Sequence, residues 1–104
     1  MAVPLEAIRK AVSEVARQNG ARLAVLFGSY ARGTATDRSD IDVIFVGETD
    51  LPFLKRLDLY VDPLTDRLNT NVETLVYTPR EFEEMRDRPF VRRALEEGIV
   101  IYES

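Results

Sequence analysis

The sequence predicts an α/β (α+β) domain in which helices pack on a small sheet. Stretches with helical spacing of apolar residues alternate with a small number of short stretches that have strand composition. No repeat, linker or low-complexity segment divides the 104 residues. A chain of this length can bury one hydrophobic core, so we expect residues 1–104 to form a single domain.

The chain is expected to begin with an amphipathic helix over residues 4–20. Apolar side chains recur there at helical spacing, at Leu5, Ile8, Val12, Val15 and Ala16. Pro4 lies near the expected start and Gly20 provides a stop. The stretch RLAVLF (22–27) then predicts a strand, which Gly28 ends.

A short helical turn (SYARG) and a second strand (DIDVIFVG, 40–47) are expected next. The strand is rich in β-branched and aromatic residues and is ended by a glycine. Residues 50–68 show apolar spacing close to that of a helix. Pro63 lies inside this stretch, so either the helix kinks there or Asp62 caps a short second helix.

The last third of the chain predicts a strand, two helices and a final strand. VETLVYT (72–78) has strand composition. Thr78 is an expected N-cap, Pro79 takes the first helical position, and Glu81 completes a capping box. PFVRRALEEG then predicts a short helix with a glycine stop, and IVIYE predicts the last strand.

The composition excludes several classes of site and partner. The chain has no cysteine and no histidine, which removes disulfides, thiolate nucleophiles and the usual zinc ligands. Any metal must then be bound through oxygen, which favours magnesium, manganese or calcium. The net charge of −4 argues against general nucleic-acid binding. Without a long apolar stretch or a secretory signal, we expect no membrane association and a cytoplasmic location.

Two carboxylates at the second strand need a physical explanation, because burying a carboxylate is costly. Residues i and i+2 of a strand share a face, so Asp40 and Asp42 are expected to project together. Like charges repel unless a cation lies between them, and a divalent ion held through oxygen is the simplest candidate. The alternatives are that this Asp-x-Asp pair caps a helix or pairs with Arg32.

Gly28 and Ser29 lie where the first strand gives way to the expected turn. Glycine lets the backbone approach a ligand closely, and the amides of the turn with the Ser29 hydroxyl suit a phosphate group. Arg32 and Arg38 add positive charge, although Arg32 could equally hold a carboxylate. Gly-Ser alone is a common structural turn. A phosphate cradle beside a carboxylate pair, however, is what a nucleoside triphosphate with its metal requires.

The stretch GSYARGTATDRSDIDV resembles the signature of the minimal nucleotidyltransferases, the MNT group of the DNA polymerase β-like superfamily. That signature is Gly-Ser, a few residues, Arg-Gly, a spacer and Ser-Asp-x-Asp. Every fixed position is met, by Gly28, Ser29, Arg32, Gly33, Ser39, Asp40 and Asp42. The likeness continues through VYTPREFEEM to FVRRALEEGIVIYE, so it covers nearly the whole chain.

The resemblance implies a polymerase β-like palm, with helices packed on a small mixed four-stranded sheet. It also implies transfer of a nucleoside monophosphate from a triphosphate, usually ATP, with release of pyrophosphate. Gly28 and Ser29 would then hold the triphosphate, and Asp40 and Asp42 would bind Mg²⁺ or Mn²⁺. The third carboxylate of the family, normally Asp, corresponds here to Glu73, which is one methylene longer. This difference bears on turnover more than on nucleotide binding; as an alternative, Glu73 is an exposed strand residue.

The acceptor of the nucleotide is expected on a second protein, because four strands and their helices use nearly all of the chain. In the MNT group, single-domain members often pair with a helical HEPN toxin, so the resemblance implies such a partner and an antitoxin role here. A non-catalytic antitoxin that masks its partner is the alternative, and transfer to a small molecule such as an aminoglycoside is a third. We expect residues 80–97 to form a solvated face. Glu48, Asp50 and Asp62 are poorer site candidates because they lie at the ends of elements.

Overall fold

The computed structural model describes residues 2–104. Within them the chain forms helices and strands in the order α1 (Leu5–Gln18), β1 (Leu23–Phe27), α2 (Ser29–Arg32), β2 (Ile41–Val46), α3 (Phe53–Leu68), β3 (Val72–Tyr77), α4 (Pro79–Met85), α5 (Pro89–Glu97) and β4 (Ile99–Glu103).

The four strands form one mixed sheet in the order β3-β2-β1-β4. β1 pairs antiparallel with β2 on one side and with β4 on the other. β2 and β3 run parallel, and α3 makes the crossover between them. The mixed four-stranded sheet predicted from the family resemblance is therefore confirmed.

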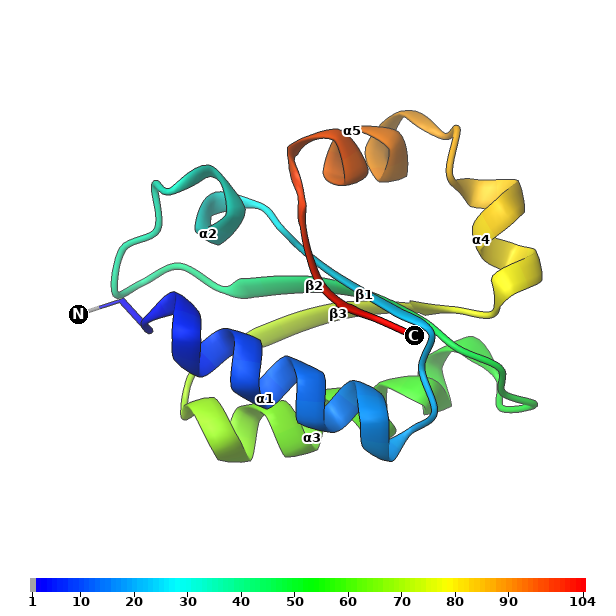
Figure 1. Ribbon diagram of the computed structural model, residues 1–104, viewed down its shortest axis with the longest axis horizontal. Coiled ribbons are helices and arrows are strands. Elements are labelled where there is room, and N and C mark those ends of the chain that lie inside the picture. Colours follow the sequence, from blue (N-terminus) through cyan, green and yellow to red (C-terminus); the bar gives the residue numbers. More distant parts are fainter. Residues whose placement is uncertain (1) are drawn as a thin grey trace.

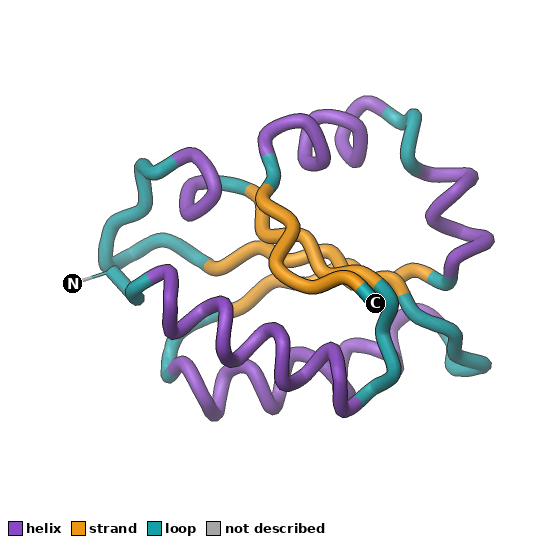
Figure 2. Tube along the Cα trace, in the orientation of Figure 1, coloured by secondary structure: helices purple, strands orange, loops and turns teal. Residues whose placement is uncertain are grey.

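Helices cover both faces of the sheet (Figure 1). α1 and α3 lie on one face, where they bury the cluster that includes Ile8, Val12 and Phe45. α4 and α5 lie on the other face, over a smaller cluster that includes Ile44, Tyr77 and Val91. The strands thus run between two groups of helices, as Figure 2 shows. Alternate residues of β2 and β3 face opposite clusters, which decides where each polar side chain of these strands points.

The predicted elements are present, with small differences at their ends. The first three strands are each one or two residues shorter than predicted, and β2 begins at Ile41, which leaves Asp40 in the preceding loop. Of the two possibilities for residues 50–68, neither a second cap at Asp62 nor a separate second helix is formed. α3 continues through Pro63 as one helix.

The polar side chain of Asn19 helps α3 to accommodate Pro63. Proline lacks an N–H, so the carbonyl of Leu59, four residues earlier, loses its partner within the helix. Asn19 Nδ2 donates to this carbonyl at 3.0 Å and also to Val15 O at 3.0 Å, at the end of α1. One side chain therefore joins the end of α1 to the interrupted turn of α3.

Replacing Asn19 with alanine is expected to lower the free energy of unfolding by about 1 kcal/mol, since Leu59 O and Val15 O lose a donor. Urea unfolding of the wild type and the variant measures this cost. In a Pro63→Ala background the restored N–H of residue 63 can bond Leu59 O, so the same Asn19→Ala change should cost less. An equal cost in the two backgrounds would mean that Asn19 does not compensate for the proline.

A buried arginine joins α3 to the start of α4. Thr78 Oγ1 accepts from Glu81 N at 3.2 Å and Glu81 Oε1 accepts from Thr78 N at 2.8 Å, which is the predicted capping box. Arg56 is only 6% exposed; it donates to both carboxylate oxygens of Glu81, to Val76 O and to Leu51 O. Nothing in the helical pattern of residues 50–68 distinguishes this arginine from a solvated one.

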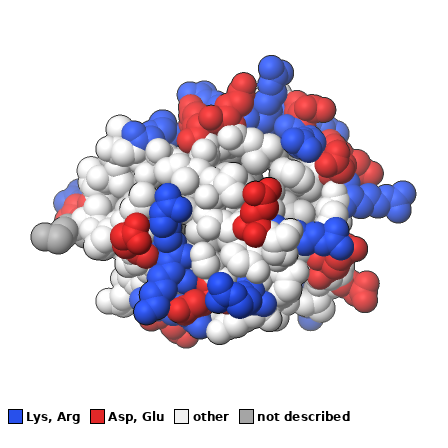
Figure 3. All heavy atoms as spheres, in the orientation of Figure 1, with Lys and Arg blue, Asp and Glu red and all other residues white. Residues whose placement is uncertain are grey.

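Two further observations concern the length of the helices and the distribution of charge on the surface. None of the helices in residues 2–104 is long and apolar enough to cross a membrane. On the face drawn in Figure 3, acidic and basic side chains alternate around a largely uncharged central area.

Candidate active site

Asp42 and Glu73 lie side by side on the two parallel strands. In the register of the sheet, Asp42 of β2 is opposite Glu73 of β3 on one side and Phe27 of β1 on the other. Asp42 shares a strand face with Ile44, and Glu73 shares one with Leu75, so both carboxylates lie on the α4–α5 face of the sheet. The third carboxylate named by the family resemblance is thus a direct neighbour of Asp42.

Gly28 lies against the carboxylate of Asp42. Its backbone has φ +73°, in the region that favours glycine, and it forms the N-cap of the single-turn helix α2. A Cβ atom at this position would lie 2.2 Å from Asp42 Oδ2, far inside van der Waals contact. Both the backbone angle and the approach of the carboxylate therefore require glycine at residue 28.

The carboxyl group of Asp42 is held in an environment that disfavours its charge. Burial first, and then the negative charge of Glu73 and a hydrogen bond with it, raise the Asp42 pKa from 3.8 to about 6. The charge of Asp40 acts in the same direction, and the positive charge of Arg32 opposes it. A cation placed at this pair would remove the repulsion.

The donor set is made of oxygen atoms, which is the preference of Mg²⁺ and Mn²⁺. Among residues 2–104 no three acidic side chains stand close enough together to hold an ion by themselves. The pair Asp42–Glu73 fits the habit of Mg²⁺, which binds through one or two carboxylates and fills its other positions with water and substrate phosphate.

A cavity of about 890 Å³ opens beside this pair. Four of the seven predicted site residues line this one cavity: Gly28, Arg32, Asp42 and Glu73. Its volume lies within the range of pockets that hold small molecules and cofactors.

The remaining predicted residues do not line the cavity. Ser29 begins α2, directly after Gly28. Asp40 lies in the loop before β2, where Ser39 Oγ accepts from Thr36 N at 2.9 Å and closes the loop. Arg38 is exposed in the same loop, and its N–H donates to Thr36 Oγ1 at 3.2 Å.

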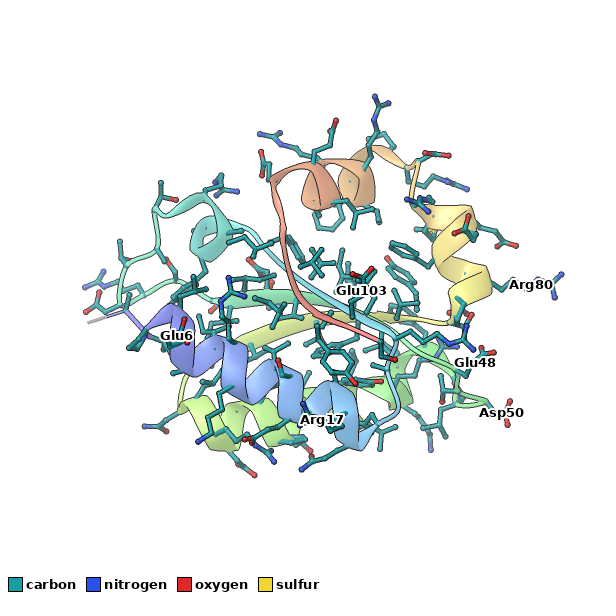
Figure 4. All side chains as sticks on the ribbon, in the orientation of Figure 1. Glu6, Arg17, Glu48, Asp50, Arg80 and Glu103 are labelled. Atoms are coloured by element: carbon teal, nitrogen blue, oxygen red, sulfur yellow. The ribbon has the colours of Figure 1, made fainter. Side chains whose placement is uncertain are left out.

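The weaker carboxylate candidates differ in position. Glu48 and Asp50 project from the end of the molecule that carries α4, well away from α2 (Figure 4). Asp62 was expected to be a poor candidate because it would lie at the end of an element. It lies instead within α3, and it lines the cavity.

Arg32 has a carboxylate partner that the sequence did not indicate. Its Nη1 lies 3.3 Å from Glu97 Oε2 on α5, and Arg93 Nε lies 3.2 Å from Glu97 Oε1. This places an arginine–glutamate–arginine group at the cavity, between α2 and α5. Arg32 therefore holds a carboxylate, that of Glu97, and its side chain is also exposed to the cavity, where a phosphate group could reach it.

Helix α5 forms part of the cavity wall, which the sequence did not indicate. Residues 80–97 were expected to be a solvated face, yet Phe90, Arg93, Ala94 and Glu97 of α5 line the cavity. Their spacing of three, one and three residues is that of one helical face, which is the signal that could have found them. Phe90 also meets Phe27 edge to face, with ring centroids 5.9 Å apart.

Gly28→Ala is expected to destabilise the protein by about 1–3 kcal/mol and to weaken binding of the ATP that the family resemblance implies, because the new Cβ strains the backbone and displaces the Asp42 carboxylate. Chemical unfolding and calorimetry measure the two effects. Gly20→Ala is the matched control, since Gly20 has φ +67° but no atom within 4 Å of the position that a Cβ would take. If both variants lost the same stability and kept ATP binding, the contact with Asp42 would have no consequence.

The raised Asp42 pKa gives a pH-dependent difference in stability. A group whose pKa rises on folding contributes stability below its unfolded pKa, here 3.8, and loses it as the pH passes through the folded value of about 6. Without divalent metal, Asp42→Asn should match the wild type near pH 4 and exceed it at pH 7.5 by an amount on the order of 2 kcal/mol. Urea unfolding at both pH values tests this, and a constant difference would contradict it.

Solved structures share this fold. A structure described as a "putative minimal nucleotidyltransferase" is 28% identical, with a TM-score of 0.68 over 91% of this chain and 90% of that one. A toxin-antitoxin structure with AMP-PNP is 23% identical, with a TM-score of 0.70 over 92% of this chain and 73% of that one. A structure described as "tri-AMPylated Shewanella oneidensis HEPN toxin in complex with MNT antitoxin" contains a chain that is 19% identical to this one. The TM-score is 0.65 over 97% of this chain and 74% of that one. The architecture is that of a minimal nucleotidyltransferase.

The family follows from the sequence match. A family model described as "Polymerase beta, Nucleotidyltransferase" matches residues 10–104. A relative from Methanocaldococcus jannaschii, named "Putative protein adenylyltransferase MJ0604", is 37% identical over 78 residues, which are 75% of each chain. The protein belongs to the polymerase beta nucleotidyltransferase family and is a nucleotidyltransferase enzyme.

Proposed function

We propose that this protein transfers AMP from ATP to a hydroxyl group of a partner protein, in a reaction that depends on Mg²⁺ or Mn²⁺. The observation that carries the proposal is the contact of three elements at one point: Asp42 of β2 and Glu73 of β3 lie side by side, and Gly28 closes on Asp42 from the end of β1.

Each predicted site residue has a role in this proposal. Gly28, Ser29, Arg32 and Arg38 bind the triphosphate, through close backbone approach at Gly28 and through positive charge at the two arginines. Asp42 and Glu73 would hold the metal ion, with Asp40, whose charge acts on Asp42, as a further carboxylate. The bound ion supplies neutralisation of the phosphate charge during transfer.

The reaction is a displacement at phosphorus. The hydroxyl oxygen of the acceptor forms a bond to the α-phosphorus, and the bond from that phosphorus to the oxygen bridging toward the β-phosphate breaks. Pyrophosphate leaves with that bridging oxygen, and the hydroxyl proton passes to a carboxylate of the Asp42–Glu73 pair. A carboxylate within reach of the acceptor hydroxyl can take up its proton as a general base.

The similar proteins support the donor and the acceptor. The M. jannaschii relative is named as a protein adenylyltransferase, and AMP-PNP, an ATP analogue, occurs with one structural neighbour. The S. oneidensis neighbour is an MNT antitoxin in complex with an AMPylated HEPN toxin. We therefore propose a helical HEPN-type partner, an antitoxin role for this chain, and the cytoplasm, where ATP is supplied, as the place of reaction.

Calorimetry with ATP, followed by a transfer assay, tests the proposal. ATP should bind the wild type with Mg²⁺ present and much more weakly without it. In the Asp40→Asn/Asp42→Asn double variant, Mg²⁺ should no longer increase the affinity for ATP. With a HEPN protein encoded beside this chain, mass spectrometry should then find an added AMP and released pyrophosphate. ATP binding without any transfer to that partner would favour a non-catalytic antitoxin, a role that the longer Glu73 side chain could accompany.

A further inference from the structure

The outer edge of β3 is open where it borders the cavity. β3 is an edge strand, with β2 on one side only. Asn71 O accepts from Ile41 N and Tyr77 O accepts from Gly47 N, so the odd-numbered residues of this segment direct their backbone groups toward β2. The even-numbered residues Val72, Thr74 and Val76 therefore direct their N–H and C=O groups to the outside.

Within residues 2–104, hydrogen bonds occupy only one end of this outer edge. Arg56 Nη1 donates to Val76 O at 3.0 Å and covers the end of β3 that leads to α4. For Val72 and Thr74, the part of the chain that the structure describes supplies no comparable backbone partner outside the sheet. Both residues line the cavity, so the unpaired groups of the strand border open space.

The cavity extends around this edge onto both faces of the sheet. Asp42, Glu73 and Leu75 line it on the α4–α5 face, and we call this part the upper lobe. Val72 and Thr74 line it on the opposite face together with Leu57 and Val61 of α3, which form the lower lobe. An extended chain placed along β3 would send successive side chains alternately into the two lobes.

The lower lobe has a defined chemistry. Leu57 and Val61 are half-buried and apolar, and the exposed carboxylates of Asp58 and Asp62 stand beside them, one residue further along α3 in each case. Such a wall fits lysine or arginine, whose aliphatic stem covers apolar surface while the charged end reaches a carboxylate.

A buried hydroxyl on the lower face also lacks a partner. Thr74 is 9% exposed, and its Oγ1 has no hydrogen-bond partner among residues 2–104. Buried hydroxyls are almost always hydrogen-bonded, so an unpaired one beside an open strand edge points to a group supplied by a ligand.

We propose that the acceptor is an extended polypeptide segment that adds to the outer edge of β3 as a further strand. Its hydroxyl-bearing residue faces the upper lobe at Asp42 and Glu73, and the basic residues on either side of it face the lower lobe at Asp58 and Asp62. The inference rests on the proposed function for the role of the hydroxyl. The docking itself needs neither ATP nor transfer.

Strand addition accounts for both the open edge of β3 and the acidic rim of α3. The main-chain groups of Val72 and Thr74 gain partners, the pleat sets the distance between the hydroxyl and its basic neighbours, and the acidic rim of α3 selects those neighbours. The closed end at Val76 limits how far the segment can extend toward α4.

The test uses synthetic peptides with blocked termini, in which tyrosine serves as the hydroxyl-bearing residue and has lysine on both sides. They are titrated into the ¹⁵N-labelled full chain without ATP. The amide signals of Val72 and Thr74 should shift and their hydrogen exchange should slow, while the inward amides of Glu73 and Leu75 change little. A peptide with glutamate in place of both lysines should bind at least tenfold more weakly. Equal binding of the two peptides, or no binding of the lysine peptide at millimolar concentration, would overturn the proposal.

Backbone methylation distinguishes strand addition from other modes of docking. In an added strand only alternate backbone N–H groups face β3. Methylation of the backbone nitrogen of the tyrosine and methylation of the backbone nitrogens of the two lysines must therefore have opposite outcomes. One of these two peptides should lose at least tenfold in affinity, and the other should keep its affinity. Equal affinities of the two methylated peptides would exclude an added strand.

Variants of α3 test the acidic rim. Asp58→Asn/Asp62→Asn should weaken the lysine peptide about tenfold, whereas Asp66→Asn, an exposed carboxylate of α3 outside the cavity, is the matched control and should change nothing. Calorimetry with ATP and Mg²⁺ on the same samples separates the two hypotheses. Intact ATP binding with no peptide binding overturns the docking mode alone, and the reverse result overturns the nucleotide site alone.

Discussion

Asp42→Asn is expected to reduce AMP transfer by about a thousandfold or more while the protein stays folded. Asparagine keeps the shape of the side chain but removes the charge that would hold the metal ion, and metal stabilisation of the transferring phosphate is worth several kcal/mol. Its amide can donate to Glu73 as the protonated Asp42 carboxyl does, so the apo protein should not lose stability. Transfer of radiolabelled AMP to the proposed HEPN-type partner, measured beside circular dichroism, gives both quantities.

The matched control for this change is Asp50→Asn. Asp50 is an exposed carboxylate at the end of the molecule near α4, and its removal changes the net charge by the same amount (Figure 4). It should transfer AMP like the wild type. Full activity of Asp42→Asn would refute the metal-binding role proposed for the Asp42–Glu73 pair.

Arg56→Leu is expected to lower the free energy of unfolding by about 2–3 kcal/mol, chiefly because the buried Val76 O is left without its donor, whereas the Glu81 carboxylate is exposed enough to be hydrated. Three groups lose their donor together: the carbonyls of Leu51 and Val76 and the carboxylate of Glu81. Urea or thermal unfolding measures the change. A loss of this size is a large part of the stability of a domain this small, so poor expression of the folded variant is an expected accompaniment.

Arg80→Leu serves as the control for Arg56→Leu, because Arg80 projects from α4 into solvent (Figure 4). Its effect should stay within about 0.5 kcal/mol. Arg56 also holds the pKa of Glu81 below its usual range, chiefly through their hydrogen bond. This contribution is present above the unfolded pKa of Glu81 and is lost on acidification, so the difference between wild type and Arg56→Leu should shrink as the pH falls. A difference that stays constant would show that the ion pair carries none of the effect.

The sequence was sufficient to predict the order of the elements and the adjacency of Asp42 and Glu73. Helical spacing, β-branched stretches and the capping box at Thr78 and Glu81 are local signals, and they predicted the element order correctly. The pairing of Asp42 with Glu73 also followed from the family pattern, which assigns the third carboxylate to a neighbouring strand.

Features that depend on tertiary packing could not be predicted in this way. Pro63 left two local outcomes open, and in the observed one the carbonyl that Pro63 leaves unpaired accepts a hydrogen bond from Asn19, at the end of another helix. Arg56 has the sequence appearance of a solvated helix residue, yet it is buried by contacts with residues 20 and 25 positions away. The α5 wall of the cavity was missed because a charged helix that borders a site and one that faces solvent have similar composition.

The pairing of β1 with β4 has a kinetic consequence. Leu23 is opposite Glu103, so the sheet closes only when stretches near opposite ends of the chain meet. Contacts of such long sequence separation slow folding, because the chain loses the entropy of a large loop before the pairing rewards it. Until β4 arrives, β1 presents an unpaired edge made of LAVLF, a short apolar strand that can pair with the same segment of another molecule. The concentration of chains still lacking that last pairing therefore sets how much of the protein aggregates during refolding.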